Sequence, residues 1–204
     1  MDKGSNDKRV SVGKNQVRLP KKFMTERVII AGAGGQGIMV LGRVLAEAAM
    51  REHKFTTWLP AYGAEVRGGT AYCMVIISTQ EIGSPFIDQA DTLIMMNQPS
   101  LGKFKHRLSR KGLLIANSSL VKINIQNKGS LLQAPFTDIA VGLGNIKVAN
   151  MVAVGCYAAS KKNIHPETVI KVIIDMAPKD KLALVEINKQ ALLKGIELVR
   201  AKLW

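Results

Sequence analysis

The strongest constraint on the fold is a short apolar run that passes directly into a cluster of glycines and then into a helical pattern. Residues 27–31 read Arg-Val-Ile-Ile-Ala, which is typical of a buried strand. Residues 32–37 read Gly-Ala-Gly-Gly-Gln-Gly. The apolar residues after this cluster recur on one helical face, at Ile38, Leu41, Leu45 and Ala48. A strand, a glycine turn and a helix in this order predict the start of a β-α-β unit.

The rest of the chain continues the alternation of strands and helices. We predict further strands at residues 55–59, 71–78, 92–96 and 112–116. Pro60 is expected to stop the first of these strands, and residues 82–85 read as a turn. We predict helices at residues 101–108, 146–159, 166–176 and 180–203. The predicted fold class is therefore α/β: a single domain with a mostly parallel sheet flanked by helices, a Rossmann-like opening β-α-β unit and a helical C-terminal third.

The N-terminal segment differs from the rest of the chain. Residues 1–24 show no apolar periodicity and are rich in Lys, Asn, Gly and Ser. We predict that they form a flexible basic extension ahead of one domain of residues 25–204. No run reaches the roughly 18 consecutive apolar residues of a membrane span, and no apolar segment of a signal peptide follows the basic N-terminus. We therefore expect a cytoplasmic protein with no membrane partner.

The two cysteines limit the redox chemistry of the chain. Cys73 and Cys156 lie in separate apolar runs, where a reduced cysteine behaves as a small hydrophobe. An iron–sulfur cluster needs about four cysteine ligands. None of the three histidines flanks either cysteine at the spacing of a zinc site. We predict no metal ligand in this chain and a reducing compartment.

The positive charge is concentrated. The formal net charge is +14, and no acidic residue occurs between Asp91 and Asp138. That stretch contains seven cations, at Lys103, Lys105, Arg107, Arg110, Lys111, Lys122 and Lys128. Such a field attracts nucleic acids, acidic proteins or phosphate esters, and it is equally typical of a solvated surface. We expect no nucleic-acid partner, because the chain shows no helix-turn-helix, zinc or aromatic-stacking pattern.

The glycine cluster has both a functional and a structural interpretation. Gly32, Gly34 and Gly37 satisfy G-x-G-x-x-G between a strand and a helix, where backbone N–H groups can bind an anion. The glycines could instead serve only the close packing of the helix on the sheet. A dinucleotide site would also need an acid at the end of the second strand, which instead ends Trp-Leu-Pro. Glu52 has about the right offset, but it lies at the end of the helix.

A second candidate site follows the second predicted strand. Residues 60–70 read Pro-Ala-Tyr-Gly-Ala-Glu-Val-Arg-Gly-Gly-Thr. Because loops at the carboxyl ends of parallel strands meet at one edge, this loop is expected beside the glycine cluster. Glu65 and Arg67 carry opposite charges, and two glycines next to Arg67 permit close approach of a neighbour.

Four segments in the same order give the chain a family resemblance. Residues 32–38, 61–71, 82–85 and 147–155 resemble the gamma subunit of 2-oxoacid:ferredoxin oxidoreductases, and the resemblance runs from residue 26 to residue 155. The small subunit of indolepyruvate:ferredoxin oxidoreductase is an alternative. It shares the glycine cluster, but its second loop usually reads differently before the arginine. A stand-alone nucleotide-binding Rossmann-like protein is a third reading.

The resemblance implies a supporting role in a multi-subunit enzyme. The family converts a 2-oxoacid, such as pyruvate or 2-oxoglutarate, with coenzyme A and oxidised ferredoxin to acyl-CoA, carbon dioxide and reduced ferredoxin. Thiamine diphosphate, Mg²⁺ and iron–sulfur clusters are then expected on partner subunits (alpha, beta and a ferredoxin-like delta), and the isolated chain is expected to be inactive. We predict no catalytic residue here. The predicted cofactor-binding residues are Gly32, Gly34, Gly35, Gln36 and Gly37. The predicted contacts to a partner or to coenzyme A are Tyr62, Glu65, Arg67, Gly68 and Gly69.

Overall fold

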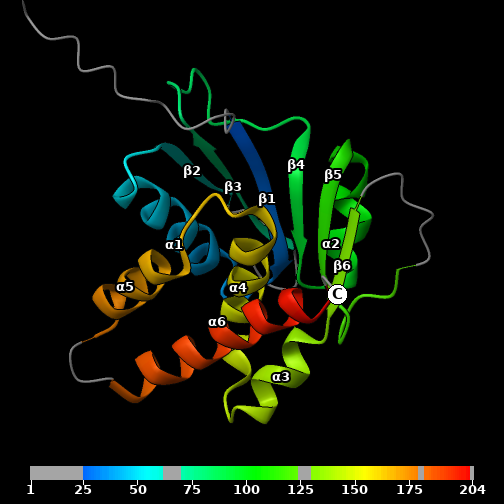
Figure 1. Cartoon of the computed structure of the whole chain (residues 1–204). Coiled ribbons are helices and arrows are strands. Elements are labelled where there is room, and N and C mark those ends of the chain that lie inside the picture. Colours follow the sequence, from blue (N-terminus) through cyan, green and yellow to red (C-terminus); the bar gives the residue numbers. More distant parts are fainter. Residues whose placement is uncertain (1–24, 62–69, 124–129, 179–181, 203–204) are drawn as a thin grey trace, which may run out of the picture.

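The computed structural model describes residues 25–61, 70–123, 130–178 and 182–202. The predicted N-terminal extension and most of the second candidate loop lie outside these ranges. Within them, the chain forms a central sheet with helices on both faces (Figure 1).

Six strands form one sheet in the order β2-β3-β1-β4-β5-β6. The strands are β1 (Thr25–Ala33), β2 (Phe55–Ala61), β3 (Thr70–Ser78), β4 (Ala90–Met95), β5 (Leu108–Asn117) and β6 (Ser130–Ala134). Only β3 runs antiparallel to its neighbours, β1 and β2, so the other five strands share one direction. The predicted mostly parallel α/β sheet is confirmed. The opening β-α-β unit is present, with β3 inserted between its two parallel strands.

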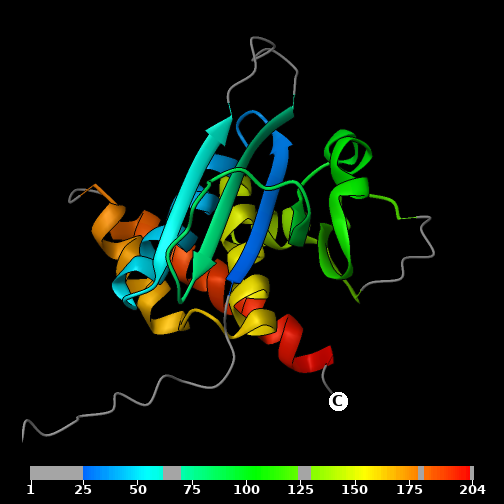
Figure 2. The ribbon, with the colours of Figure 1, turned by 90° about the horizontal axis from the view of Figure 1, so that it is seen from above.

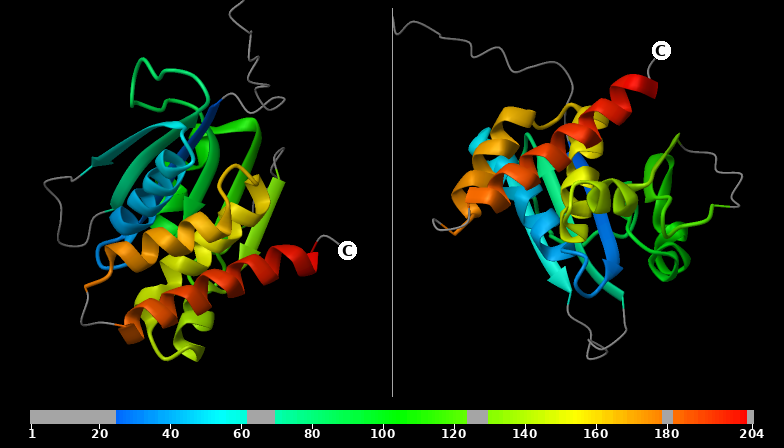
Figure 3. Two further views of the ribbon diagram at one scale, coloured as in Figure 1. Left: turned by 60° about the vertical axis from the view of Figure 1, so that its left-hand side comes forward. Right: turned by 90° about the horizontal axis from the view of Figure 1, so that it is seen from below.

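The helices are unequally divided between the two faces of the sheet. They are α1 (Ile38–Arg51), α2 (Gln98–Phe104), α3 (Phe136–Gly142), α4 (Ala149–Lys161), α5 (Pro166–Met176) and α6 (Leu182–Lys202), with 3-10 turns at Lys105–Arg107 and Ile146–Val148. Helices α1, α4, α5 and α6 gather on one face, whereas α2 lies on the other (Figures 2 and 3). None of the helices in the described ranges is long and apolar enough to cross a bilayer.

Two apolar clusters, one on each face, hold the layers together. The larger cluster joins alternate residues of the strands, such as Val28 and Ile30, to the inner sides of α1 and α4. The smaller cluster joins the intervening residues, such as Ile29 and Ala31, to Phe104 of α2. Burying both faces explains why the central strands read as continuous apolar runs instead of alternating patterns.

Three local predictions were wrong or incomplete. Pro60 does not stop β2, which continues to Ala61 with Pro60 opposite Cys73. Because β2 is an edge strand, its outer side pairs with no other strand in the described sheet. A proline, which lacks an N–H, therefore removes no hydrogen bond between strands on that side. The helix predicted at residues 101–108 ends earlier, and Leu108 already begins β5. Neither β6 nor α3 was predicted as a separate element, although α3 falls within the predicted helical C-terminal third.

Candidate functional site

The two candidate loops start from the same edge of the sheet. Ala33 at the end of β1 pairs with Thr70, and Ala61 at the end of β2 pairs with Tyr72. The glycine turn and both ends of the second loop therefore lie together, as the sequence predicts. The second loop itself, with Tyr62, Glu65, Arg67, Gly68 and Gly69, lies outside the described residues.

The glycines of the turn divide into two kinds. A Cβ on Gly32 would lie 2.6 Å from the side chains of Gln36 and Ile38, and a Cβ on Gly37 would lie 2.3 Å from Nδ2 of Asn150. These two glycines serve close packing. Gly34 and Gly35 are exposed, and no atom of the described residues lies within 4 Å of a Cβ added to either of them; Gly35 has a φ of +86°. The open side of the turn is thus formed by Gly34 and Gly35.

Gln36 braces the turn from inside. Its Oε1 accepts a hydrogen bond from the backbone N–H of Ala33 at 2.7 Å, and its Nε2 donates to the carbonyl of Met96 at 3.3 Å. Both ends of the side-chain amide are therefore used within the protein. This geometry holds the turn against the end of β4, while the ligand contact predicted for Gln36 stays a prediction.

Three polar residues from other elements complete the edge. Asn150 of α4 donates from Nδ2 to the carbonyl of Gly37 at 3.2 Å, while its buried Oδ1 accepts no hydrogen bond from the part of the chain that the structure describes. Asn117 at the end of β5 donates to Met96 O at 3.2 Å and to Oγ1 of Thr137 at 2.8 Å. Sequence reasoning did not select these residues. Asn150 lies within one of the four resembling segments, which was the only available signal.

Two neighbouring hollows lie along this edge. A small pocket of about 130 Å³ opens beside the glycine turn; its lining residues are Gly35, Gln36, Leu120, Thr137, Ile146, Lys147 and Ala149. A cleft of about 630 Å³ shares Leu120 with it; its other lining residues are Gln98, Leu101, Gly102, Lys105, Ser118, Ser119, Val121 and Lys122. The exposed Lys147, Lys105 and Lys122 make the two hollows basic. Exposed helix N–H groups and lysines of this kind can bind phosphate oxygens.

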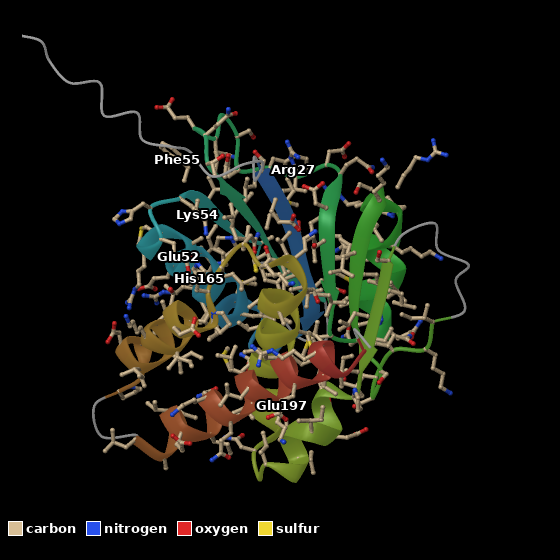
Figure 4. The ribbon with its side chains drawn as sticks, viewed as in Figure 1. Arg27, Glu52, Lys54, Phe55, His165 and Glu197 are labelled. Atoms are coloured by element: carbon tan, nitrogen blue, oxygen red, sulfur yellow. The ribbon has the colours of Figure 1, made fainter. Side chains whose placement is uncertain are left out.

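Glu52, the acid at the offset of a ribose ligand, is engaged elsewhere. It follows the last residue of α1, with Lys54 and His165 beside it (Figure 4). Its carboxylate accepts hydrogen bonds from Nζ of Lys54 and from the backbone N–H of His165, both at 2.7 Å. Burial acts to raise the pKa of Glu52, but these hydrogen bonds and one from Thr168 outweigh burial and lower the pKa. The carboxylate is therefore a structural anchor between α1 and α5.

The fold and this edge define a class: a single α/β domain whose glycine turn opens at the carboxyl ends of parallel strands. Residues 27–198 match the family model described as "Pyruvate ferredoxin/flavodoxin oxidoreductase", and the chain belongs to that family. The family resemblance predicted from the four sequence segments is confirmed.

Individual relatives agree with the family. Ketoisovalerate oxidoreductase subunit VorA of Methanothermobacter thermautotrophicus is 35% identical over 182 residues, which cover 88% of this chain but only 37% of the relative. 2-Oxoglutarate synthase subunit KorC of Archaeoglobus fulgidus is 33% identical over 172 residues, 84% of this chain and 86% of the relative. The crystal structure of a keto/oxoacid ferredoxin oxidoreductase gamma subunit from Geobacter sulfurreducens superposes with a TM-score of 0.75 at 29% identity, covering 86% of this chain and 99% of that chain.

Proposed function

We propose that the chain is the gamma subunit of a multi-subunit enzyme that converts a 2-oxoacid, coenzyme A and oxidised ferredoxin to acyl-CoA, carbon dioxide and reduced ferredoxin. The main support is the family match over residues 27–198, joined by the similarity to a gamma subunit over 86% of this chain. Relatives named for 2-oxoglutarate, pyruvate and ketoisovalerate make a 2-oxoacid the substrate class.

The redox cofactors are proposed to lie on the alpha, beta and ferredoxin-like delta subunits. Cys73 and Cys156 do not fit a cluster, because both are buried in the core and donate to backbone carbonyls of Ile38 and Gly195. Burial raises the pKa of the Cys73 thiol to about 12, so the thiolate that metal ligation requires is disfavoured. Cys73 is a buried, reduced thiol, which favours a reducing, cytoplasmic location.

The hollow beside the glycine turn is proposed to contact coenzyme A. Gly34 and Gly35 present an open turn at the N-terminus of α1, and Lys147 lines the pocket against it. Coenzyme A carries phosphate esters, which suit helix N–H groups and lysine side chains. Arg67 and Glu65 stay part of this proposal on sequence grounds, because their loop starts and ends at the same edge.

A test of this contact compares two lysine variants in the assembled oxidoreductase. Lys147→Gln removes a charge from the pocket, and Lys171→Gln removes a charge from an exposed position on α5. Loss of one hydrogen bond to a charged group predicts a Michaelis constant for coenzyme A raised roughly tenfold or more in Lys147→Gln, with kcat and assembly retained. Equal Michaelis constants for Lys147→Gln, Lys171→Gln and the wild type would mean that coenzyme A does not bind in this hollow.

A further inference from the structure

Two groups of cations among the described residues differ in their ion pairing. Eight ion pairs join acids to the cations Arg27, Arg43, Arg51, Lys54, Lys161, Lys189 and Lys194. None of these pairs includes the cations of α2, its following turn, β5 and the segment after β5. We call the members of this second group on the α2 side the basic band; it consists of Lys103, Lys105, Arg107, Arg110 and Lys122, whereas Lys111 lines a pocket with residues of α4 and α6. Its charge is therefore not neutralised by any ion pair within the described ranges.

Two members of the basic band are held by aromatic rings. The guanidinium of Arg107 lies 5.2 Å from the ring centre of Phe86, and its Nε donates to the carbonyl of Asp88 at 2.9 Å. Nζ of Lys103 lies 5.4 Å from the ring centre of Tyr72. These contacts fix the cations without neutralising them. Phe86 is 60% exposed, so its ring is available to a neighbour.

The basic band borders a part of the sheet without a helical cover. On the face of β2 and β3 opposite α1, Leu59 and Tyr72 are only partly buried. The segment around Ile87 covers Met74, to whose sulfur its N–H donates at 3.3 Å. Among the described residues, the only helix on this face is α2, at its β4 side (Figure 2). An apolar and aromatic strip therefore lies directly beside unneutralised cations.

Resting on the function proposed above, we propose that this surface docks against an acidic surface of another subunit of the same oxidoreductase. Arg, Tyr and Phe are the residues that protein interfaces favour, and this surface carries two such pairs, Arg107 with Phe86 and Lys103 with Tyr72. A partly buried apolar strip bordered by cations suits a protein surface with an acidic rim. This chain covers only 37% of the relative VorA, so the matching region in that relative is part of a longer polypeptide.

The test replaces two exposed members of the basic band and measures the affinity of the full chain for the other purified subunits. Lys103→Glu with Arg110→Glu reverses two charges in the band. The control, Lys171→Glu with Lys189→Glu, makes the same change in net charge on α5 and α6. We expect the band variant to bind about tenfold more weakly and the control to stay near the wild type. Raising the salt concentration from 50 to 200 mM shortens the electrostatic screening length roughly twofold. The affinity of the wild-type chain for the other subunits should therefore decrease over this range.

A second variant keeps the proposal testable if charge reversal disturbs folding. Phe86→Ser removes an exposed ring without a change in charge, and it should also weaken docking while the melting temperature is retained. Wild-type chain that binds none of the subunits would overturn the proposed function and this docking surface with it. Subunits that bind the wild type, the band variant, Phe86→Ser and the control equally would overturn the docking surface alone. A DNA duplex that binds the wild type but not the band variant, with subunit binding equal in both, would assign the band to nucleic acid instead.

Discussion

Cys73 lies where α1 packs closely against the sheet. Its thiol donates to the carbonyl of Ile38, and a Cβ on Gly42 would approach its sulfur to 2.4 Å. The helix and the sheet can therefore approach closely here because a glycine on α1 faces a small side chain on β3. Burial raises the pKa of the thiol to about 12.

This raised pKa predicts a loss of stability in mildly alkaline solution. The thiol titrates near 9.0 in the unfolded chain and near 12 in the folded protein. Both states keep the proton below pH 9. Above it, only the unfolded state loses the proton, so the free energy of unfolding should fall by up to about 1.4 kcal/mol per pH unit. Urea unfolding at pH 8, 9 and 10 measures this slope, and Cys73→Ala should flatten it. An unchanged slope in Cys73→Ala would assign the alkaline loss to other groups.

Residue roles at the carboxyl edge were only partly predictable. The G-x-G-x-x-G pattern located the turn, because strand and helix flank it in the sequence. It did not separate the packing glycines Gly32 and Gly37 from the open Gly34 and Gly35, since that difference depends on side chains from distant elements. Asn150 bonds to the turn across 113 positions of sequence, which no local pattern encodes.

At the scale of elements, α4 and α6 cross with their backbones in close approach. A Cβ on Gly155 would lie 2.1 Å from the carbonyl oxygen of Leu192, and a Cβ on Gly195 would lie 2.1 Å from that of Val152. Each glycine therefore faces backbone atoms that cannot rotate away. A run of small apolar residues predicted the first helix and an amphipathic pattern predicted the second, whereas the crossing point depends on how the two helices pack and is not visible in either sequence segment alone.

This crossing predicts opposite effects for the same substitution at different glycines. Gly155→Ala or Gly195→Ala should force the helices apart and lower the free energy of unfolding by about 3 kcal/mol, at the upper end of overpacking effects. Gly102→Ala in α2 is the matched control, because nothing lies within 4 Å of its built Cβ. There, the better helix propensity of Ala should raise stability by about 0.5–1 kcal/mol. Chemical denaturation measures the free energy of unfolding of the three variants. Equal changes in this free energy at all three positions would contradict the close crossing of α4 and α6.

At the scale of the whole molecule, the sequence predicted the layers better than the strand directions. Apolar runs separated by helical patterns indicated a sheet covered on both faces. The same pattern could not show that β3 runs antiparallel between β1 and β2, because a buried strand reads alike in either direction. This inserted strand brings Thr70 next to Ala33, and so places both ends of the second loop at the glycine turn.

The boundary between the N-terminal extension and the domain gives the last prediction. Residues 1–24 carry no apolar periodicity, whereas β1 begins at Thr25 and lies in the middle of the sheet between β3 and β4. Deleting residues 1–24 should therefore shift the melting temperature by less than about 3 °C, the scale of ~1 kcal/mol for a domain of this size. Deleting residues 1–29 is the contrasting variant. It removes the half of β1 that contains the buried Val28 and Ile29, so cooperative unfolding should be lost. Thermal unfolding of both truncated chains, followed by circular dichroism, measures the difference. A drop of more than about 5 °C on removal of residues 1–24 alone would mean that the extension packs on the domain, and would move the boundary towards the N-terminus.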